Sequence, residues 1–256
     1  MLILLVVVLA VLVVLSRSVA SWQHVIVSGQ PGDLLYVATF DGAPADGFNG
    51  DWSQYPGRNS AQVSAGQLQI TIGEIDDGVY SLTQPHFADF DLRVQAQSLA
   101  GPVDNGYGVV FRLQNRDNTD LSDDSYYLFL ISADGYYRVS RVVEGDERIL
   151  STWIASDIIN LGLEAVNHLR VVARGAQFQF YINDQPVTLC IPSDPAAQST
   201  IHPLTGECME GEMLDLLVDA TIPNGQVGVS ASSTLTGGEG VVAAFDNLLI
   251  YAPEDS

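Results

Sequence analysis

From about residue 34 onward, apolar side chains alternate with polar ones in short runs and do not recur at helical spacing. In the run QLQITI at 67–72, the three aliphatic residues fall on one side of an extended chain and the glutamines and threonine on the other. A period of two is typical of a strand with one face in the core and the other in water. We therefore expect sheets that are buried on one face and solvated on the other.

Comparable runs, separated by Gly, Pro, Asn and Asp, predict strands at 34–40, 60–64, 67–72, 78–83, 90–98, 106–114, 126–132, 136–143, 147–153, 166–174, 177–183, 225–231 and 241–251. Two turns, RGAQ at 174–177 and INDQPV at 182–187, place Gly, Asn or Asp where a hairpin requires a positive φ. Many short strands without helical periodicity predict an all-β sandwich or barrel.

The first fifteen residues, MLILLVVVLAVLVVL, contain no polar side chain after the initiator. This composition predicts a hydrophobic helix at 1–20 that is a targeting segment and lies outside the fold. A signal peptide cleaved after SVA (18–20) and a retained signal-anchor are both compatible with it, although a spanning helix needs about 20 apolar residues. We expect a linker at 21–33 and a domain at 34–252 outside the cytoplasm, held at the cell membrane through the N-terminal segment only, or secreted if the leader is cleaved.

The two cysteines, Cys190 and Cys208, stand eighteen residues apart in an irregular stretch interrupted by prolines. In an exported protein such a pair usually forms a disulfide. We expect 190–222 to be a long loop stapled by this bond, with a helical turn in EGEMLDLLVDA at 210–220.

The charge of the chain excludes one class of partner. There are 31 acidic residues and ten basic ones, all arginine, which gives a formal net charge of −21. A strongly acidic surface repels phosphate backbones, so nucleic acid is not expected as a partner.

A set of motifs occurs in a recognisable order: Gly106–Arg112, Tyr126–Ile131, Asp134–Val139, Asn167–Val172, Phe178–Asn183, Gly225–Val229 and Phe245–Ile250. Over about residues 35–251 the sequence resembles the concanavalin A-like lectin/glucanase superfamily, in particular laminin-G-like and 3-keto-disaccharide hydrolase-like domains of exported bacterial proteins. The resemblance implies a two-sheet antiparallel jelly-roll sandwich with carbohydrate sites on its concave face. It does not imply one activity, because that superfamily contains both lectins and glycosidases.

No catalytic residues are predicted. Glycoside hydrolysis needs two carboxylates about 5–10 Å apart, and laminarinase-type relatives place them in an E-x-D-x-x-E strand. The nearest match, Glu74-Ile-Asp76, lacks the third acid, and the histidines at 24, 86, 168 and 202 follow no metal-binding pattern. We therefore expect a protein that is not an enzyme.

An acidic stretch at 116–125 contains Asp117, Asp120, Asp123 and Asp124. Oxygen-rich clusters can hold calcium, but this one lacks the glycine and the distal glutamate of an EF-hand loop. A solvated hairpin tip is the favoured interpretation. We expect no cofactor, with calcium as the alternative.

The tyrosine-rich hairpin at 125–142 is the candidate ligand site. Both faces of its first strand are apolar, which indicates a central strand, whereas Tyr136 and Arg138 on the second strand form a mixed face. A tyrosine ring beside a guanidinium is suited to saccharides, because the ring stacks on C–H faces and the guanidinium reaches hydroxyls. We expect Tyr126 and Arg112 to complete this platform. Cross-strand aromatic packing without a ligand is the alternative.

Three functions follow from these observations. The first is a non-catalytic binding or sensing ectodomain for carbohydrate or another extracellular ligand. The second is a glycosidase-like enzyme whose acids come from separate strands. The third is a structural spacer.

Overall fold

The computed structural model describes residues 25–41, 52–73, 78–115, 123–233 and 240–254 of the chain. The expected helix at 1–20, the acids Glu74 and Asp76, and the aspartates Asp117 and Asp120 lie outside these ranges. Within them, no helix is long and apolar enough to cross a membrane.

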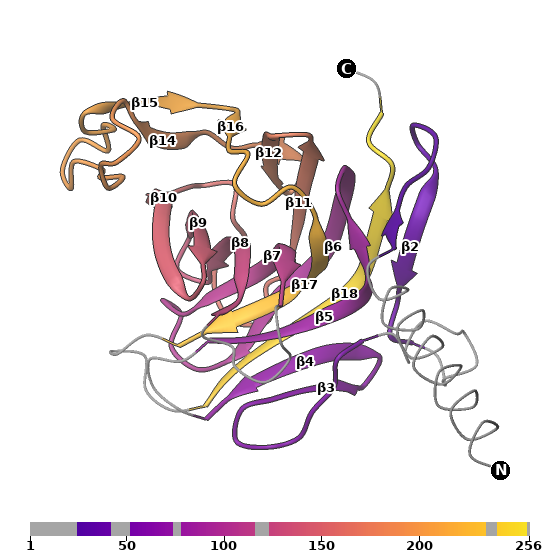
Figure 1. Cartoon of the computed structure of the whole chain (residues 1–256). Helices are drawn as coiled ribbons and strands as arrows, with labels where there is room; N and C mark the ends of the chain where they lie inside the picture. Colours follow the sequence, from indigo (N-terminus) through magenta and orange to yellow (C-terminus); the bar gives the residue numbers. More distant parts are fainter. Residues whose placement is uncertain (1–24, 42–51, 74–77, 116–122, 234–239, 255–256) are drawn as a thin grey trace, which may run out of the picture.

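Two curled sheets make up the sandwich, and a separate two-stranded sheet lies outside them (Figure 1). The seven-stranded sheet has the order β1 (Ile26–Val27), β5 (Gly78–Phe87), β17 (Gly225–Ser232), β7 (Gly106–Gln114), β8 (Ser125–Ser132), β9 (Tyr136–Val143) and β10 (Asp146–Ala155). The nine-stranded sheet has the order β13 (Gln185–Pro186), β12 (Gln177–Ile182), β11 (Asn167–Arg174), β6 (Phe90–Ala100), β18 (Val241–Tyr251), β4 (Gln67–Ile72) and β3 (Ser60–Ser64). In addition, β16 (Leu217–Val218) pairs with β12, and β2 (Leu34–Ala38) pairs with β18. Neighbours are antiparallel except β1 and β5.

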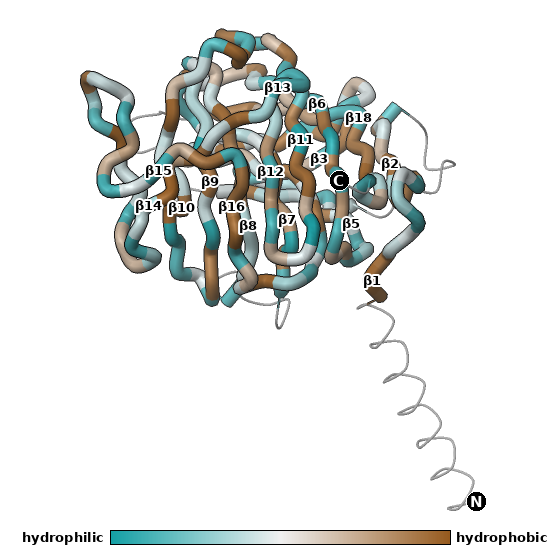
Figure 2. Tube along the Cα trace, turned by 90° about the horizontal axis from the view of Figure 1, so that it is seen from above, coloured by the Kyte–Doolittle hydropathy of each residue, from teal (hydrophilic) through white to brown (hydrophobic). Residues whose placement is uncertain are grey.

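The all-β sandwich is therefore confirmed, and its alternating pattern is visible along the strands in Figure 2. Two expected irregular stretches contain short strands instead. Ile26–Val27 extends the sheet from within the expected linker, and β14 (Leu189–Pro192) pairs with β15 (Gly211–Leu214) within the expected loop. The helical turn expected at 210–220 is wrong, because this apolar run pairs with β14 and β12 and not with itself.

The core lies between the two sheets and is rich in aromatic rings. Phe111 stacks on Tyr127 with ring centroids 5.3 Å apart, and Tyr127 contacts Phe178 of the opposite sheet at 5.1 Å. Phe129 meets Phe180 across the same space at 5.0 Å. Such ring pairs stabilise the fold by more than the burial of their apolar area alone. The inner face of the tyrosine-rich hairpin is thus a core element.

Arg112 is not on the outer face of the sheet, as the sequence suggested, but in this core. It sits at a bulge of β7 with φ of 53°, where the extra residue turns its side chain inward, and the side chain is 1% exposed. The guanidinium lies 4.7 Å from the centre of the Phe178 ring. It donates hydrogen bonds to the carbonyls of Ala88 (2.7 Å), Ile222 (2.9 Å) and Gly175 (2.6 Å).

These three carbonyls belong to different parts of the fold. Ala88 connects the two sheets between β5 and β6, Gly175 lies in the β11–β12 turn, and Ile222 precedes β17. Burial lowers the pKa of Arg112, but arginine keeps its charge in proteins. Arg112 therefore ties the seven-stranded sheet to the nine-stranded one.

Replacing Arg112 with Met should destabilise the protein by at least about 3 kcal/mol, because each of the three buried carbonyls then lacks its donor at a cost of about 1–3 kcal/mol. Arg58→Met is the matched control, since Arg58 is exposed and donates to one carbonyl, that of Gly73. Urea unfolding measures the free energy of unfolding of both variants. Equal losses for the two variants would show that Arg112 does not have the joining role.

Candidate functional site

The candidate site lies on the outer face of β8, β9 and β10. The turn between β8 and β9 holds it in register: Gly135 adopts φ of 97°, and its N–H donates to the carbonyl of Ser132. The Ser132 hydroxyl donates to the Asp134 carboxylate and accepts from the backbone N–H of Tyr136. Tyr136 therefore begins β9 directly beside an anchored turn.

The two faces of the hairpin differ in burial. Phe129 and Val139 are opposite each other on the inner face and are completely buried. On the outer face, Leu130 is opposite Arg138, and Tyr136 is 39% exposed. The hairpin is thus a core element whose outer face reaches solvent at Tyr136.

Trp153 of β10, which is not among the ligand residues expected from the sequence, joins Arg138 on this face. The Arg138 guanidinium lies 5.3 Å from the centre of a Trp153 ring and donates to the Glu147 carboxylate at 2.9 Å. The tryptophan side chain extends across the sheet toward β7, because a Cβ built on Gly106 would lie 3.5 Å from its Cη2 atom. The Trp153 ring therefore packs over Gly106, which has no side chain to displace it, and against the Arg138 guanidinium.

Tyr126 occupies the other end of the same face. Its ring is 5.9 Å from that of Tyr80, although three strand spacings, about 14 Å, separate β8 from β5. The rings can meet only because the sheet curls toward this side. The outer face of the seven-stranded sheet is consequently the concave one.

Two carboxylates flank Tyr126. Burial raises the pKa of Tyr126 to about 12, and the negative charges of Glu147 and Asp124 add to this effect. The Tyr80 hydroxyl donates to the Asp124 carboxylate, and burial together with this bond raises the pKa of Tyr80 well above its ordinary value. Both phenols remain neutral at physiological pH and can donate hydrogen bonds.

A shallow pocket of about 420 Å³ opens at the turn end of the face. It is lined by the turn between β8 and β9 and by the end of β10 with the residues after it: Asp134, Gly135, Tyr136, Ala155, Ser156, Asp157 and Leu161. The Tyr136 ring can stack on a sugar, and the carboxylates of Asp134 and Asp157 can accept hydrogen bonds from the sugar hydroxyls. This pocket and the Arg138–Trp153 pair form one continuous surface, because Tyr136 belongs to the pocket and to the same face of β9.

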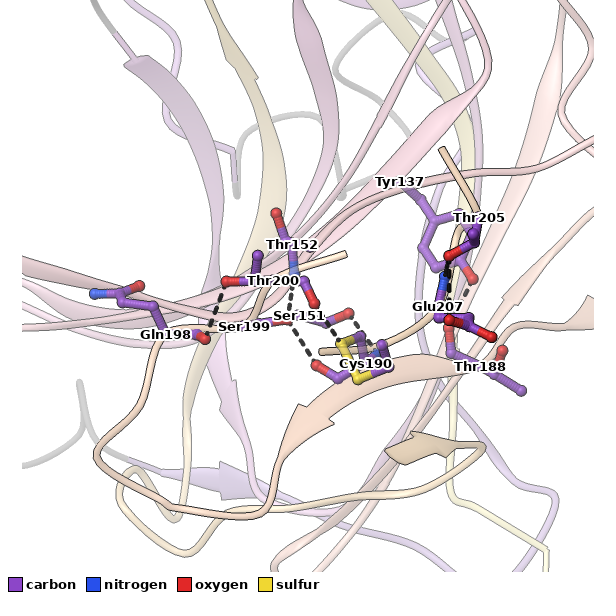
Figure 3. Close-up of a disulfide and its surroundings, with 11 residues drawn as sticks. Tyr137, Ser151, Thr152, Thr188, Cys190, Gln198, Ser199, Thr200, Thr205 and Glu207 are labelled. Atoms are coloured by element: carbon purple, nitrogen blue, oxygen red, sulfur yellow. Dashed lines mark hydrogen bonds between the residues drawn. A yellow bond between two sulfur atoms is a disulfide. The ribbon is translucent and has the colours of Figure 1, made fainter. Parts of the chain in front are cut away.

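The disulfide between Cys190 and Cys208, as predicted, is present and lies next to β10 (Figure 3). The Cys190 N–H donates to the Ser151 hydroxyl at 3.1 Å, and the Ser199 hydroxyl accepts from the Thr152 N–H at 3.0 Å. The stapled segment thus covers the free edge of the strand that carries Trp153. Covering an edge strand protects it from pairing with other chains.

Of the four predicted ligand residues, the structure brings Tyr126, Tyr136 and Arg138 to one face and places Arg112 elsewhere. The calcium alternative gains no support in the described ranges, which contain no group of three His, Cys, Asp or Glu side chains able to hold a metal. Trp153 and Glu147 were missed because two register shifts in the β9–β10 pairing decide which residues stand beside Arg138.

Comparisons with known proteins agree with this architecture. No family model and no curated protein matches the sequence. Among solved structures, the carbohydrate binding module CBM66 from Bacillus subtilis has a TM-score of 0.51 at 14% identity, covering 77% of this chain and 93% of its own. A Bacillus subtilis protein of unknown function with a galectin-like fold has a TM-score of 0.57 at 11% identity, covering 87% and 97%. The Crh5 transglycosylase has a TM-score of 0.51 at 12% identity, covering 88% of each chain.

Likeness at these identities concerns the fold. The chain shares with these proteins the two-sheet jelly-roll sandwich that its sequence motifs indicated.

The two faces of the hairpin should respond differently to truncation. Phe129→Ala should cost about 3–5 kcal/mol, because it removes a buried ring and leaves a cavity. Tyr136→Ala should change the free energy of unfolding by less than about 1 kcal/mol, since exposed positions usually tolerate substitution. Denaturant unfolding of both variants is the measurement, and a loss at Tyr136 as large as that at Phe129 would make Tyr136 a core residue.

Proposed function

We propose that this domain is a non-catalytic carbohydrate-binding module whose ligand lies on the concave face, over Trp153 and Tyr136. The single observation that carries the proposal is the arrangement of Trp153, Arg138 and Glu147. An aromatic ring packed against a cation lies next to charged groups that can bind hydroxyls. Tyr136 and Ala155, two residues from Arg138 and Trp153 on the same strands, line a neighbouring pocket. Such a combination of an apolar platform with a few convergent polar groups is typical of small-ligand sites.

The comparisons support the same class of ligand. One structural neighbour is a carbohydrate binding module and another a transglycosylase, and both share the sandwich over more than three quarters of this chain. The resemblance in sequence leads to the same expectation. We propose further that the protein is exported, with residues 1–20 as an anchor or a cleaved leader. The disulfide supports export, since such bonds persist mainly in oxidising compartments.

A glycosidase-like enzyme is the second candidate, and one observation favours it. Asp124, just before β8, and Glu147 of β10 come from separate parts of the chain and are both close enough to Tyr126 to raise its pKa. However, Asp124 is completely buried and accepts a hydrogen bond from Tyr80, so it is not presented to a substrate. Binding without turnover is therefore the better supported function.

Binding to neutral oligosaccharides should depend on the aromatic platform. With a ligand identified on a glycan array, Trp153→Ala and Tyr136→Ala should each weaken binding about tenfold, since the loss of one stacking ring together with its buried area is worth about 1.4 kcal/mol or more. Arg138→Ala should also weaken it, because the guanidinium no longer fixes the tryptophan ring. Isothermal titration calorimetry on the full chain measures these affinities.

Arg58→Ala is the control, because this exposed arginine lies beside β3 of the other sheet and should leave the affinity unchanged. Unaltered binding in both aromatic variants would contradict the proposed site. Release of shorter saccharides, detected by mass spectrometry and lost in Glu147→Gln, would favour the enzyme instead.

A further inference from the structure

The outer face of the nine-stranded sheet carries a row of side chains that the concave site does not involve. Tyr181 of β12, Arg170 of β11, Arg93 of β6 and Leu249 of β18 stand directly opposite one another on successive strands. Tyr251 and Asp91 form a second pair beside this row. Strand pairing therefore places two arginines and two tyrosines on one open surface.

The two arginines share one carboxylate. Arg93 donates to Asp91 through Nε at 3.3 Å and Nη2 at 2.6 Å, and Arg170 does so at 2.7 and 2.9 Å. Burial disfavours the charge of Asp91, but the hydrogen bonds from Arg93 and Arg170 outweigh it and lower the pKa of this carboxyl. Asp91 thus stays ionised, and its two hydrogen bonds to each guanidinium fix the orientation of both groups.

Each guanidinium is also stacked on a ring. Arg93 lies 5.0 Å from the centre of the Tyr251 ring, and Arg170 lies 4.8 Å from that of Tyr181. The side chains of Arg93 and Arg170 are nonetheless 49% and 35% exposed. Within the described part of the chain, no side chain or carbonyl accepts a hydrogen bond from Nη1 of either residue. Two rigidly held donors therefore point away from Asp91.

Arginine is concentrated on this surface. The chain carries a formal net charge of −21, yet three arginines, Arg93, Arg170 and Arg174, gather on this face. The acidic groups near them are Asp91, which is buried between two guanidinium groups, Asp246, which stands opposite Gln95, and Glu254, which lies near Arg93. His168 is exposed on the same side of β11, two residues before Arg170. A localised cationic patch attracts anions even when the rest of the surface repels them.

We propose that this face is a second binding surface, for an acidic saccharide, in which Arg93 and Arg170 bind a carboxylate or sulfate group and Tyr181 and Tyr251 flank the sugar rings. Guanidinium groups recognise both anions through paired N–H donors. Glutamines continue the surface on neighbouring strands, and their amides suit the hydroxyls of an extended chain: Gln67, Gln69, Gln95, Gln97 and Gln179.

An anionic membrane is the other partner that a cationic patch suggests, and the surface fits it less well. Peripheral membrane binding combines basic residues with apolar side chains that enter the lipid. None of the large exposed apolar residues in the described ranges lies on β4, β6, β11, β12 or β18. A polar, aromatic and cationic sheet face therefore suits a saccharide better.

The test uses the full chain, with binding measured by biolayer interferometry against polygalacturonate, dextran sulfate and neutral dextran. The wild type should bind one or both acidic polymers and not dextran, and binding should weaken as salt is raised. The two acidic polymers distinguish a carboxylate from a sulfate ligand, and either result supports the proposal. Arg93→Gln and Arg170→Gln should each weaken binding at least tenfold.

Arg58→Gln is the matched control and should bind as the wild type does. Because the Gln variants could lose stability along with the Asp91 contact, Arg93→Lys and thermal unfolding accompany them. The Lys variant keeps the charge and should retain part of the affinity. Failure of the wild type to bind either polymer, or equal binding by all folded variants, would overturn the proposal. Binding to vesicles of phosphatidylglycerol without binding to the polymers would overturn it in favour of a membrane.

Discussion

One buried arginine joins the two halves of this sandwich. The Arg112 side chain leaves the seven-stranded sheet at a bulge and donates to carbonyls from the β5–β6 connection, the β11–β12 turn and the segment before β17. A charged group without solvent is tolerated only when its donors are satisfied. The close approach of β17 to this bulge requires a glycine, because a Cβ on Gly225 would lie 2.3 Å from the Arg112 carbonyl carbon. Arg112 thus holds the β7 bulge of the concave sheet against the connections and turns of the opposite sheet.

The candidate site depends on a Trp153 ring that is held in place. Trp153 stands on an edge strand, which alone would be a poor support for a binding platform. The stapled segment makes hydrogen bonds with the adjacent residues Ser151 and Thr152 of that strand, and the Arg138 guanidinium packs against the Trp153 ring. A preorganised ring loses little freedom when a ligand binds, which favours affinity. The nine-stranded sheet repeats the principle on its outer face, where Asp91 fixes two guanidinium groups.

Much of the fold could be predicted from the sequence, because alternation and turn residues act locally. The turn INDQPV shows this well: Asn183 and Asp184 both adopt the positive φ expected of them. Arg112 could not be placed, since the extra residue of a bulge reverses the side that alternation assigns. Trp153 was missed for a similar reason, because register shifts in β10 are set by its partner strand. The pairing of β14 with β15 joins two segments that are far apart in the sequence, and taken alone these segments resemble a loop and a helical turn.

The central claim is that saccharide binds over Trp153 on the concave face. The most direct measurement is a titration followed by ¹H–¹⁵N correlation NMR of the tryptophan indoles, with the Trp153 signal assigned from Trp153→Phe. Trp52 provides an internal reference, because its side chain is buried in the core. The account predicts that a neutral oligosaccharide shifts the Trp153 indole signal in a saturable manner and leaves that of Trp52 in place. Saturable binding with an unmoved Trp153 signal would contradict it.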